Sequence, residues 1–176
     1  MTERTLPFSR MTVALTGFMG CGKSSVGREL STLLGIPVID LDRYIEERAG
    51  RSIPDIFAQS GEKAFRDLET AVLSELLVSG GQSRFILSLG GGTILRPENA
   101  ALIREHCTCI FLRAGVETLR LHLGGEQSQR PLLKGGGFEA LLQERTPFYT
   151  AAADFIIDTD TLTPMQIAGI IANLIS

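Results

Sequence analysis

The sequence predicts an α/β domain in which helices cover both faces of a parallel sheet. Short apolar, β-prone segments alternate with segments whose apolar residues recur at helical spacing, which is the pattern of strands joined by helical crossovers. A complete phosphate-binding motif also lies between the first apolar segment and the first helical one. These two observations together favour a layered α/β fold that binds a phosphorylated ligand.

The phosphate-binding motif occupies residues 17–24, which read Gly-Phe-Met-Gly-Cys-Gly-Lys-Ser and match the pattern G-x-x-x-x-G-K-[ST]. An apolar strand is expected before it at residues 12–16 and an amphipathic helix after it at residues 25–34. In such a loop the backbone N–H groups and the helix dipole hold phosphate. Lys23 would reach the outer phosphates, and the Ser24 hydroxyl would bind Mg²⁺. The alternative is a glycine-rich turn with a chance lysine, which the chain's content of only three lysines disfavours.

Five strands are expected, at residues 12–16, 38–40, 85–89, 108–112 and 155–158. Several helix starts can also be read from the sequence. Ser52 is a candidate helix cap with an acid three positions later, and Pro97 and Pro164 stand where a first helical turn tolerates proline. Residues 62–78 form the best amphipathic helix, which the Gly-Gly pair at 80–81 is expected to end.

Length and composition exclude several classes of protein. With 176 residues, 44% apolar and 21% charged, the chain is expected to be a single domain spanning residues 1–176. A net charge of −3 argues against a nucleic-acid partner. No apolar run approaches the ~20 residues of a membrane span, and residues 1–10 lack the apolar core of a secretory signal. We therefore expect a soluble cytoplasmic protein with neither nucleic-acid nor membrane partners.

The three cysteines are not expected to form a disulfide framework, and their odd number suits a reducing compartment. Cys21 lies inside the phosphate loop, where a small side chain suffices. Cys107 and Cys109 follow His106, and this cluster could suggest a metal site. Zinc sites usually take two separated ligand pairs, so a buried strand is the favoured interpretation.

Two carboxylates, Asp40 and Asp42, stand at the end of the second expected strand. Ligands of open α/β sheets gather outside the carboxyl ends of the strands, where the phosphate loop also lies. One acid could hold Mg²⁺ through water while the other accepts a proton or hydrogen bond from a hydroxyl, and phosphoryl transfer needs little more than that. A helix cap would explain one of the two acids but hardly both, so a functional role is favoured.

Three glycines, Gly90, Gly91 and Gly92, follow the third expected strand and would bring the backbone unusually close to a small polar acceptor. A flexible turn is the alternative. Among fourteen arginines, Arg66 and Arg145 stand out because each lies in a richer local pattern. If both face the glycines, they would clamp a carboxylate.

The segment 124–137 contains five glycines around a single arginine, Arg130. In a phosphate-binding protein such a segment suggests a closing lid. An ordinary surface loop is the alternative.

These motifs resemble those of the shikimate kinases of aromatic amino-acid biosynthesis, over nearly the whole chain. Residues 17–24 are similar to the family's phosphate loop, residues 39–46 to its substrate aspartate segment, and residues 52–66 to its most specific motif. The glycine triplet, the Arg-Pro-Leu-Leu run at 130–133 and the Arg-Thr-Pro-Phe-Tyr run at 145–149 follow in the same order. Together the motifs identify the chain as a member of this family.

The resemblance implies the fold of nucleoside monophosphate kinases: three α/β/α layers around a five-stranded parallel sheet of order 2-3-1-4-5, with a lid at 124–137 and a substrate-binding helical part at 41–69. It implies transfer of the γ-phosphoryl group of ATP to the 3-hydroxyl of shikimate. Asp42 would contact the acceptor hydroxyls as the base, Arg130 would neutralise the transferred group, and Lys23 would complete the catalytic set. Mg²⁺ would be served by Ser24 and Asp40.

Further roles are implied in the same way. The nucleotide would be bound by Gly20, Cys21, Gly22, Lys23, Ser24, Ser25 and Arg130. Shikimate would be bound by Asp42, Phe57, Phe65, Arg66, Gly90, Gly91, Gly92 and Arg145, with the arginines on its carboxylate.

The chain departs from the family at one position. Many relatives carry an adenine-stacking arginine seven residues before the lid arginine, where this chain has Leu123. Either the leucine packs against the base, or Arg120 or His122 takes the arginine's place. Residues 158–164 resemble the family's loop near the adenine. Two rival functions stay open from the residues alone: a related kinase of gluconate or a nucleoside monophosphate, and a module that senses nucleotide and shikimate without turnover.

Overall fold

The computed structural model describes residues 12–79, 84–124 and 137–176. Two sequence-based expectations lie outside these residues: the Gly-Gly end of the long helix, and nearly all of the segment 124–137 with Arg130.

Five parallel strands form one sheet in the order β2-β3-β1-β4-β5, which confirms the predicted order. Three of the strands have the expected bounds. The third strand is one residue shorter at each end than expected, and the fourth is one residue longer at each end. The strands are β1 (Thr12–Thr16), β2 (Val38–Asp40), β3 (Ile86–Ser88), β4 (Cys107–Arg113) and β5 (Phe155–Asp158).

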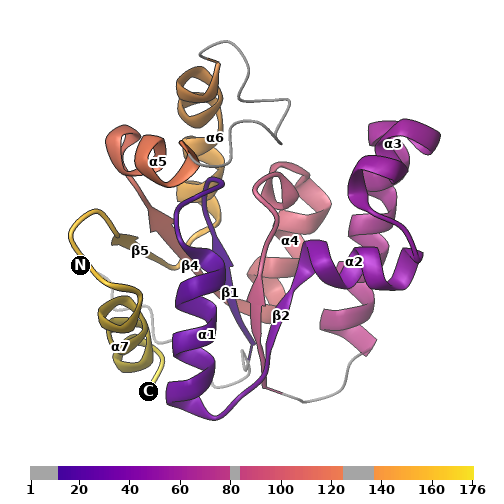
Figure 1. The fold of residues 1–176 in the computed structure, drawn as a ribbon. Coiled ribbons are helices and arrows are strands. Elements are labelled where there is room, and N and C mark those ends of the chain that lie inside the picture. The colour runs from indigo at the N-terminus through magenta and orange to yellow at the C-terminus, as the bar shows by residue number, and fades with distance from the viewer. Residues whose placement is uncertain (1–11, 80–83, 125–136) are drawn as a thin grey trace.

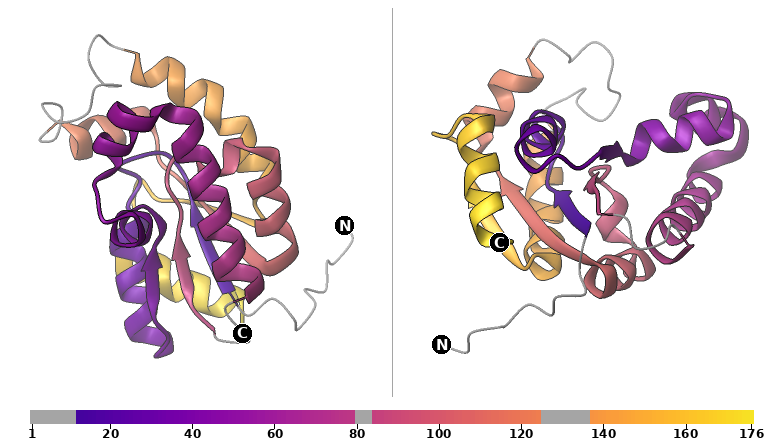
Figure 2. Two further views of the ribbon diagram at one scale, coloured as in Figure 1. Left: turned by 90° about the vertical axis from the view of Figure 1, so that its right-hand side faces the viewer. Right: turned by 90° about the horizontal axis from the view of Figure 1, so that it is seen from below.

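Helices cover both faces of this sheet, as the alternating pattern predicted (Figure 1). On one face α1 (Lys23–Leu34) packs against α7 (Pro164–Leu174), and on the other α4 (Pro97–His106) and α6 (Phe138–Ala152) pack on β4. Figure 2 shows the three layers end on. The remaining elements are α2 (Leu41–Ala49), α3 (Ile53–Ser74), the π-helical turn η1 (Glu75–Ser79), the 3₁₀ turn η2 (Thr93–Leu95) and α5 (Val116–Leu123).

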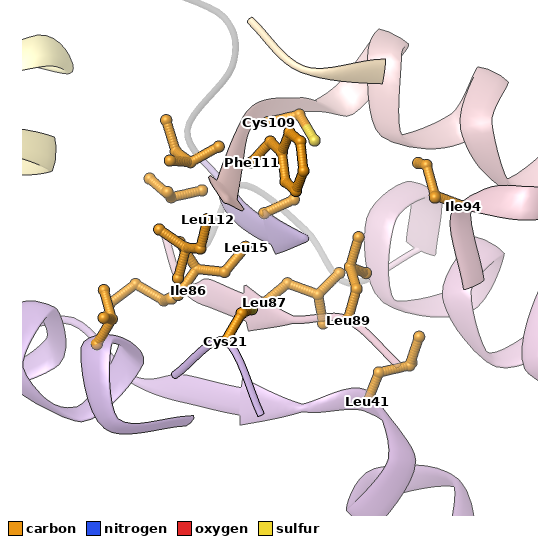
Figure 3. Close-up of a cluster of buried hydrophobic side chains, with 14 of the residues drawn as sticks. Leu15, Cys21, Leu41, Ile86, Leu87, Leu89, Ile94, Cys109, Phe111 and Leu112 are labelled. Atoms are coloured by element: carbon orange, nitrogen blue, oxygen red, sulfur yellow. The ribbon is translucent and has the colours of Figure 1, made fainter. Parts of the chain in front are cut away.

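The core lies along the three central strands. Every residue of β1 and β3, and all of β4 except its last, is buried, because helices cover both faces of a parallel sheet. Figure 3 shows side chains of these strands packed together, among them Leu15, Leu87 and Phe111. Cys107 and Cys109 are buried in β4, as the strand interpretation predicted.

The helix caps follow the expected starts. Ser52 Oγ accepts a hydrogen bond from the Asp55 amide at 3.3 Å, and α3 begins at the next residue. Gly61 interrupts α3 with φ 81° and ψ 170°, so two helices meet there. This break accounts for the predicted start of the amphipathic helix at residue 62. None of the described helices has the length and apolarity that crossing a membrane requires.

Helix α7 begins with a complete capping box. Thr163 Oγ1 accepts from the Gln166 amide at 3.3 Å, and the Gln166 side chain accepts from the Thr163 amide at 2.9 Å. We expect Thr163→Ala to lower the free energy of unfolding by about 1 kcal/mol, measured by urea denaturation. The exposed Thr161, changed to alanine, is the matched control and should have no such effect. Equal losses in the two variants would contradict the role of the cap.

Candidate active site

A cleft of about 840 Å³ opens at the edge of the sheet where the carboxyl ends of β1, β2 and β3 meet. Every sequence-predicted site residue that the structure describes lines this one cleft. They are Gly20, Cys21, Gly22, Lys23, Ser24, Ser25, Asp40, Asp42, Phe57, Phe65, Arg66, Gly90, Gly91, Gly92 and Arg145. Only Arg130 among the predicted residues lies outside the described part of the chain.

The phosphate loop connects β1 to α1, and its glycines take conformations that other residues rarely adopt. Gly17, Gly20 and Gly22 have φ values of 141°, 81° and 98°. Gly17 is also crowded, since a Cβ there would lie 2.6 Å from the Leu112 carbonyl oxygen. No side chain caps α1, and its first turn carries no acid, so its amides and dipole are available to an anion.

The Lys23 ammonium group lies folded into its own loop. It donates to the carbonyl oxygens of Gly17 at 2.9 Å and Phe18 at 3.0 Å, and lies 3.8 Å from the Cys21 sulfur. These are weak partners for a cation compared with phosphate oxygens. The lysine is therefore held within reach of the phosphate site without an acidic partner of its own in the described residues.

Asp40 has two roles, one for each carboxylate oxygen. Oδ1 accepts from the Arg43 amide at 3.3 Å and caps α2, as the alternative interpretation predicted for one of the two acids. Oδ2 accepts from Ser24 Oγ at 3.4 Å. A hydroxyl and a carboxylate thus face each other at the start of α1, and such oxygens fit Mg²⁺, which usually takes one or two protein ligands and completes its shell with phosphates and water.

Asp42 lines the same cleft from the first turn of α2. Its pKa is raised from 3.8 to about 6, first because burial penalises the charged carboxylate and then because Asp40 and Glu69 are close. Lys23 and Arg66 act in the opposite direction. A carboxylate with a pKa near neutrality can accept a proton from a hydroxyl and release it again.

Each glycine of the triplet is approached by one predicted site residue. A Cβ at Gly90 would lie 2.5 Å from Asp42 Oδ1, and a Cβ at Gly92 would lie 2.6 Å from Arg66 Nη2. Arg145 Nη1 donates to the Gly91 carbonyl oxygen at 3.5 Å. The two arginines and the acid, which come from three different helices, therefore converge on one turn of backbone.

Glu69 is a functional candidate that sequence reasoning missed. It is fully buried, accepts from Arg66 Nη1 at 2.9 Å and accepts from Thr93 Oγ1 at 2.7 Å. It thereby ties the arginine to the turn that follows the glycine triplet. Arg66 and Glu69 are three residues apart on a helix, a spacing from which their ion pair could have been predicted. No sequence pattern predicts the contact of Glu69 with Thr93.

Two phenylalanines form the wall of the cleft beside Arg66. The rings of Phe57 and Phe65 lie 4.9 Å apart, one on each side of the break at Gly61. The Arg66 guanidinium carbon lies 5.1 Å from the Phe65 ring centroid, within the range of a cation–π contact.

The far end of the cleft is lined by α5 and by the loop after β5, including Thr159, Leu162 and Leu123. Leu123 is buried, and a Cβ at Gly20 would lie 3.0 Å from its Cδ2. His122 Nδ1 donates to the Gly20 carbonyl at 2.7 Å, whereas Arg120 forms ion pairs with Glu117 and Glu139. Leu123 and His122, not Arg120, thus lie beside the phosphate loop.

Comparison with known proteins bears on the chemistry of this cleft. A family model described as shikimate kinase matches residues 19–176. The chain is 41% identical to a shikimate kinase of Dictyoglomus turgidum over 155 residues, which is 86% of this chain and 89% of the relative. It is 42% identical to one of Thermus thermophilus over 156 residues, which is 86% of this chain and 83% of the relative.

A solved structure agrees with these sequence relatives. The chain superposes on a shikimate kinase of Acinetobacter baumannii in complex with shikimate with a TM-score of 0.83 and 34% identity, covering 97% of this chain and 93% of the other. The chain therefore belongs to the shikimate kinase family, whose members are ATP-dependent phosphotransferases that act on a hydroxyl group.

Proposed function

We propose that this member of the family transfers the γ-phosphoryl group of ATP to the 3-hydroxyl of shikimate, giving shikimate 3-phosphate and ADP. One observation carries the assignment of roles. Asp42, Arg66 and Arg145 each meet one glycine of the triplet at residues 90–92, in the same cleft as Lys23. A carboxylated alcohol and a triphosphate can therefore be bound side by side.

On the nucleotide side, the amides at the start of α1 and the Lys23 ammonium group bind the phosphates. Ser24 and Asp40 are the residues that would hold Mg²⁺. When bound, this ion neutralises charge on the phosphates. Lys23 must exchange two carbonyl partners for phosphate oxygens, which are the stronger acceptors.

On the acceptor side, Arg66 and Arg145 bind the shikimate carboxylate, and the walls of Phe57 and Phe65 exclude water from one face. Asp42 accepts the proton of the attacking hydroxyl. A bond then forms between that oxygen and the γ-phosphorus while the bond to the bridging oxygen of ADP breaks. The raised pKa of Asp42 suits it to hold this proton and then release it to solvent.

Arg130 is proposed, from its place in the sequence alone, to neutralise charge on the transferred phosphoryl group. We also propose that the protein works as a monomer in the cytoplasm. The three cysteines are all buried and none of them forms a disulfide bond, which is consistent with a reducing compartment.

ADP release from ATP and Mg²⁺ tests the proposal directly. Shikimate should stimulate release strongly, whereas gluconate and a nucleoside monophosphate should not. Lys23→Ala should abolish most turnover and weaken ATP binding, because a phosphate-contacting charge is lost in every state. Preference for another acceptor would assign a related kinase, and binding of both ligands without ADP release would assign a sensing module.

Removing Arg66 should weaken the acceptor side selectively. We expect Arg66→Ala to cost ~2–5 kcal/mol of transition-state stabilisation, which lowers kcat/KM for shikimate roughly 30- to 5000-fold. The KM for ATP should change less than about twofold. Because the change also leaves Glu69 buried without its cation, the double variant Arg66→Ala/Glu69→Gln separates lost binding from a folding defect. Arg96→Ala, which breaks the ion pair with Asp67 outside the cleft, is the control and should leave both KM values unchanged.

The burial of Asp42 should be visible as a pH-dependent cost in stability. Its pKa is raised to about 6 in the folded protein from 3.8, so the stability it contributes is fully present below pH 3.8 and is lost as the pH rises through 6. The stability of Asp42→Asn relative to the wild type should therefore increase with pH. We expect the difference between their free energies of unfolding to be ~1–3 kcal/mol larger at pH 7.5 than at pH 4, in favour of the variant. Turnover should be lost in the same variant.

Urea denaturation at the two pH values measures this difference. Asp67→Asn is the matched control. Hydrogen bonds from Lys63 and Arg96 lower the pKa of Asp67, so the stability of this variant relative to the wild type should decrease, not increase, from pH 4 to pH 7.5. A stability difference between Asp42→Asn and wild type that does not change with pH would show that Asp42 is not held in a destabilised charged state.

A further inference from the structure

A tyrosine of α6 supports the glycine triplet from behind. Tyr149 is fully buried, and its hydroxyl donates to the Gly91 carbonyl oxygen at 2.6 Å. Its ring packs on Phe111 of β4 with 5.3 Å between ring centroids. The ring contact fixes α6 to the sheet, whereas the hydroxyl contact reaches a residue of the acceptor site itself.

The same tyrosine contacts one of the two site arginines. Arg145 lies one helical turn before Tyr149, interacts electrostatically with it, and donates to the same Gly91 carbonyl oxygen at 3.5 Å. Arg145 Nε is buried and has no hydrogen-bond partner in the described part of the protein. Burial raises the pKa of Tyr149 to about 12, so its hydroxyl remains a donor throughout the neutral range.

The bond to Gly91 also orients the next amide. No described peptide is cis, and in a trans peptide the C=O and the following N–H point in opposite directions. Drawing the Gly91 carbonyl to Tyr149 therefore turns the Gly92 N–H away from Tyr149. The amides of Gly91 and Gly92 donate to no other described residue, so they are available to an acceptor in the cleft.

We infer that Tyr149 is a positioning residue for the acceptor: its hydroxyl fixes the Gly91 carbonyl, to which the Arg145 guanidinium also donates, so that the arginine and the glycine amides meet the acceptor carboxylate in one arrangement. This inference rests on the proposed function, because it takes shikimate as the acceptor. A phenylalanine would supply the same ring packing but would leave the Gly91 carbonyl without its strongest partner.

The test is Tyr149→Phe, assayed by ADP release over ranges of shikimate and ATP. We expect the KM for shikimate to rise about tenfold, which corresponds to ~1.4 kcal/mol, with kcat and the KM for ATP changed less than about twofold. The only other tyrosine in the chain provides the matched control. Tyr44→Phe removes a hydroxyl that interacts with Arg48, away from the cleft, and should change neither KM.

A purely structural role would give a different result, namely a lower melting temperature with an unchanged KM for shikimate, and that result would overturn the inference. Absence of shikimate-dependent turnover in the wild-type chain would instead contradict the proposed function, before any variant is compared.

A second measurement keeps the test independent of whether Tyr149→Phe folds. In a Tyr44→Phe chain labelled with 3-fluorotyrosine, the single fluorine signal belongs to Tyr149. Shikimate should shift this signal, and ATP with Mg²⁺ should leave it within the linewidth. A signal that does not respond to saturating shikimate would contradict the coupling between Tyr149 and the acceptor.

Discussion

The site depends on the close approach of three side chains to one turn of backbone that has no side chains of its own. Asp42 and Arg66 occupy the space that a Cβ would fill at Gly90 and Gly92. Any larger residue would push the acid or the arginine out of the cleft, because a Cβ does not tolerate a neighbour at 2.5 Å or 2.6 Å. The strand order makes the approach possible, since β3 carries the triplet between β2, which ends at the acids, and β1, which leads into the phosphate loop.

The charges of the cleft follow from the same crowding. Asp40, Asp42 and Glu69 lie close enough for the first and last to raise the pKa of the second, and only Glu69 has an arginine held directly against it. Three acids in a partly dry cleft repel one another unless cations are present. Lys23 and Arg66 supply part of this compensation, and a metal between Ser24 and Asp40 would supply more. Asp42 is therefore partly protonated near pH 6.

Local patterns were sufficient for the five strands and for several helices, but not for α5, α6 or the contacts between elements. Three strands were predicted to the residue, and α1 begins only two residues before its apolar periodicity, because the glycine turn ends directly at Lys23. The sheet order came from resemblance to a family, since periodicity does not order strands. Glu69 and Tyr149 acquire their roles through partners 24 and 58 residues away, Thr93 and Gly91, and no local pattern encodes such a pairing. The sequence left two interpretations of Asp40 open, helix cap and metal ligand. The structure allows both, because one carboxylate oxygen caps α2 and the other faces Ser24.

The two site arginines are supported in different ways, and this difference bears on how an anion is held. Arg66 is paired with the buried Glu69, which fixes its position but offsets much of its charge. Arg145 has no acidic partner among the described residues; it donates to the Gly91 carbonyl, which the Tyr149 hydroxyl also contacts, and both of these groups are neutral. Its charge is therefore left for the ligand. We infer that Arg66 mainly provides geometry and Arg145 mainly provides attraction, which is why the neutral contacts around Gly91 matter as much to the acceptor as the ion pair on the other side of the turn.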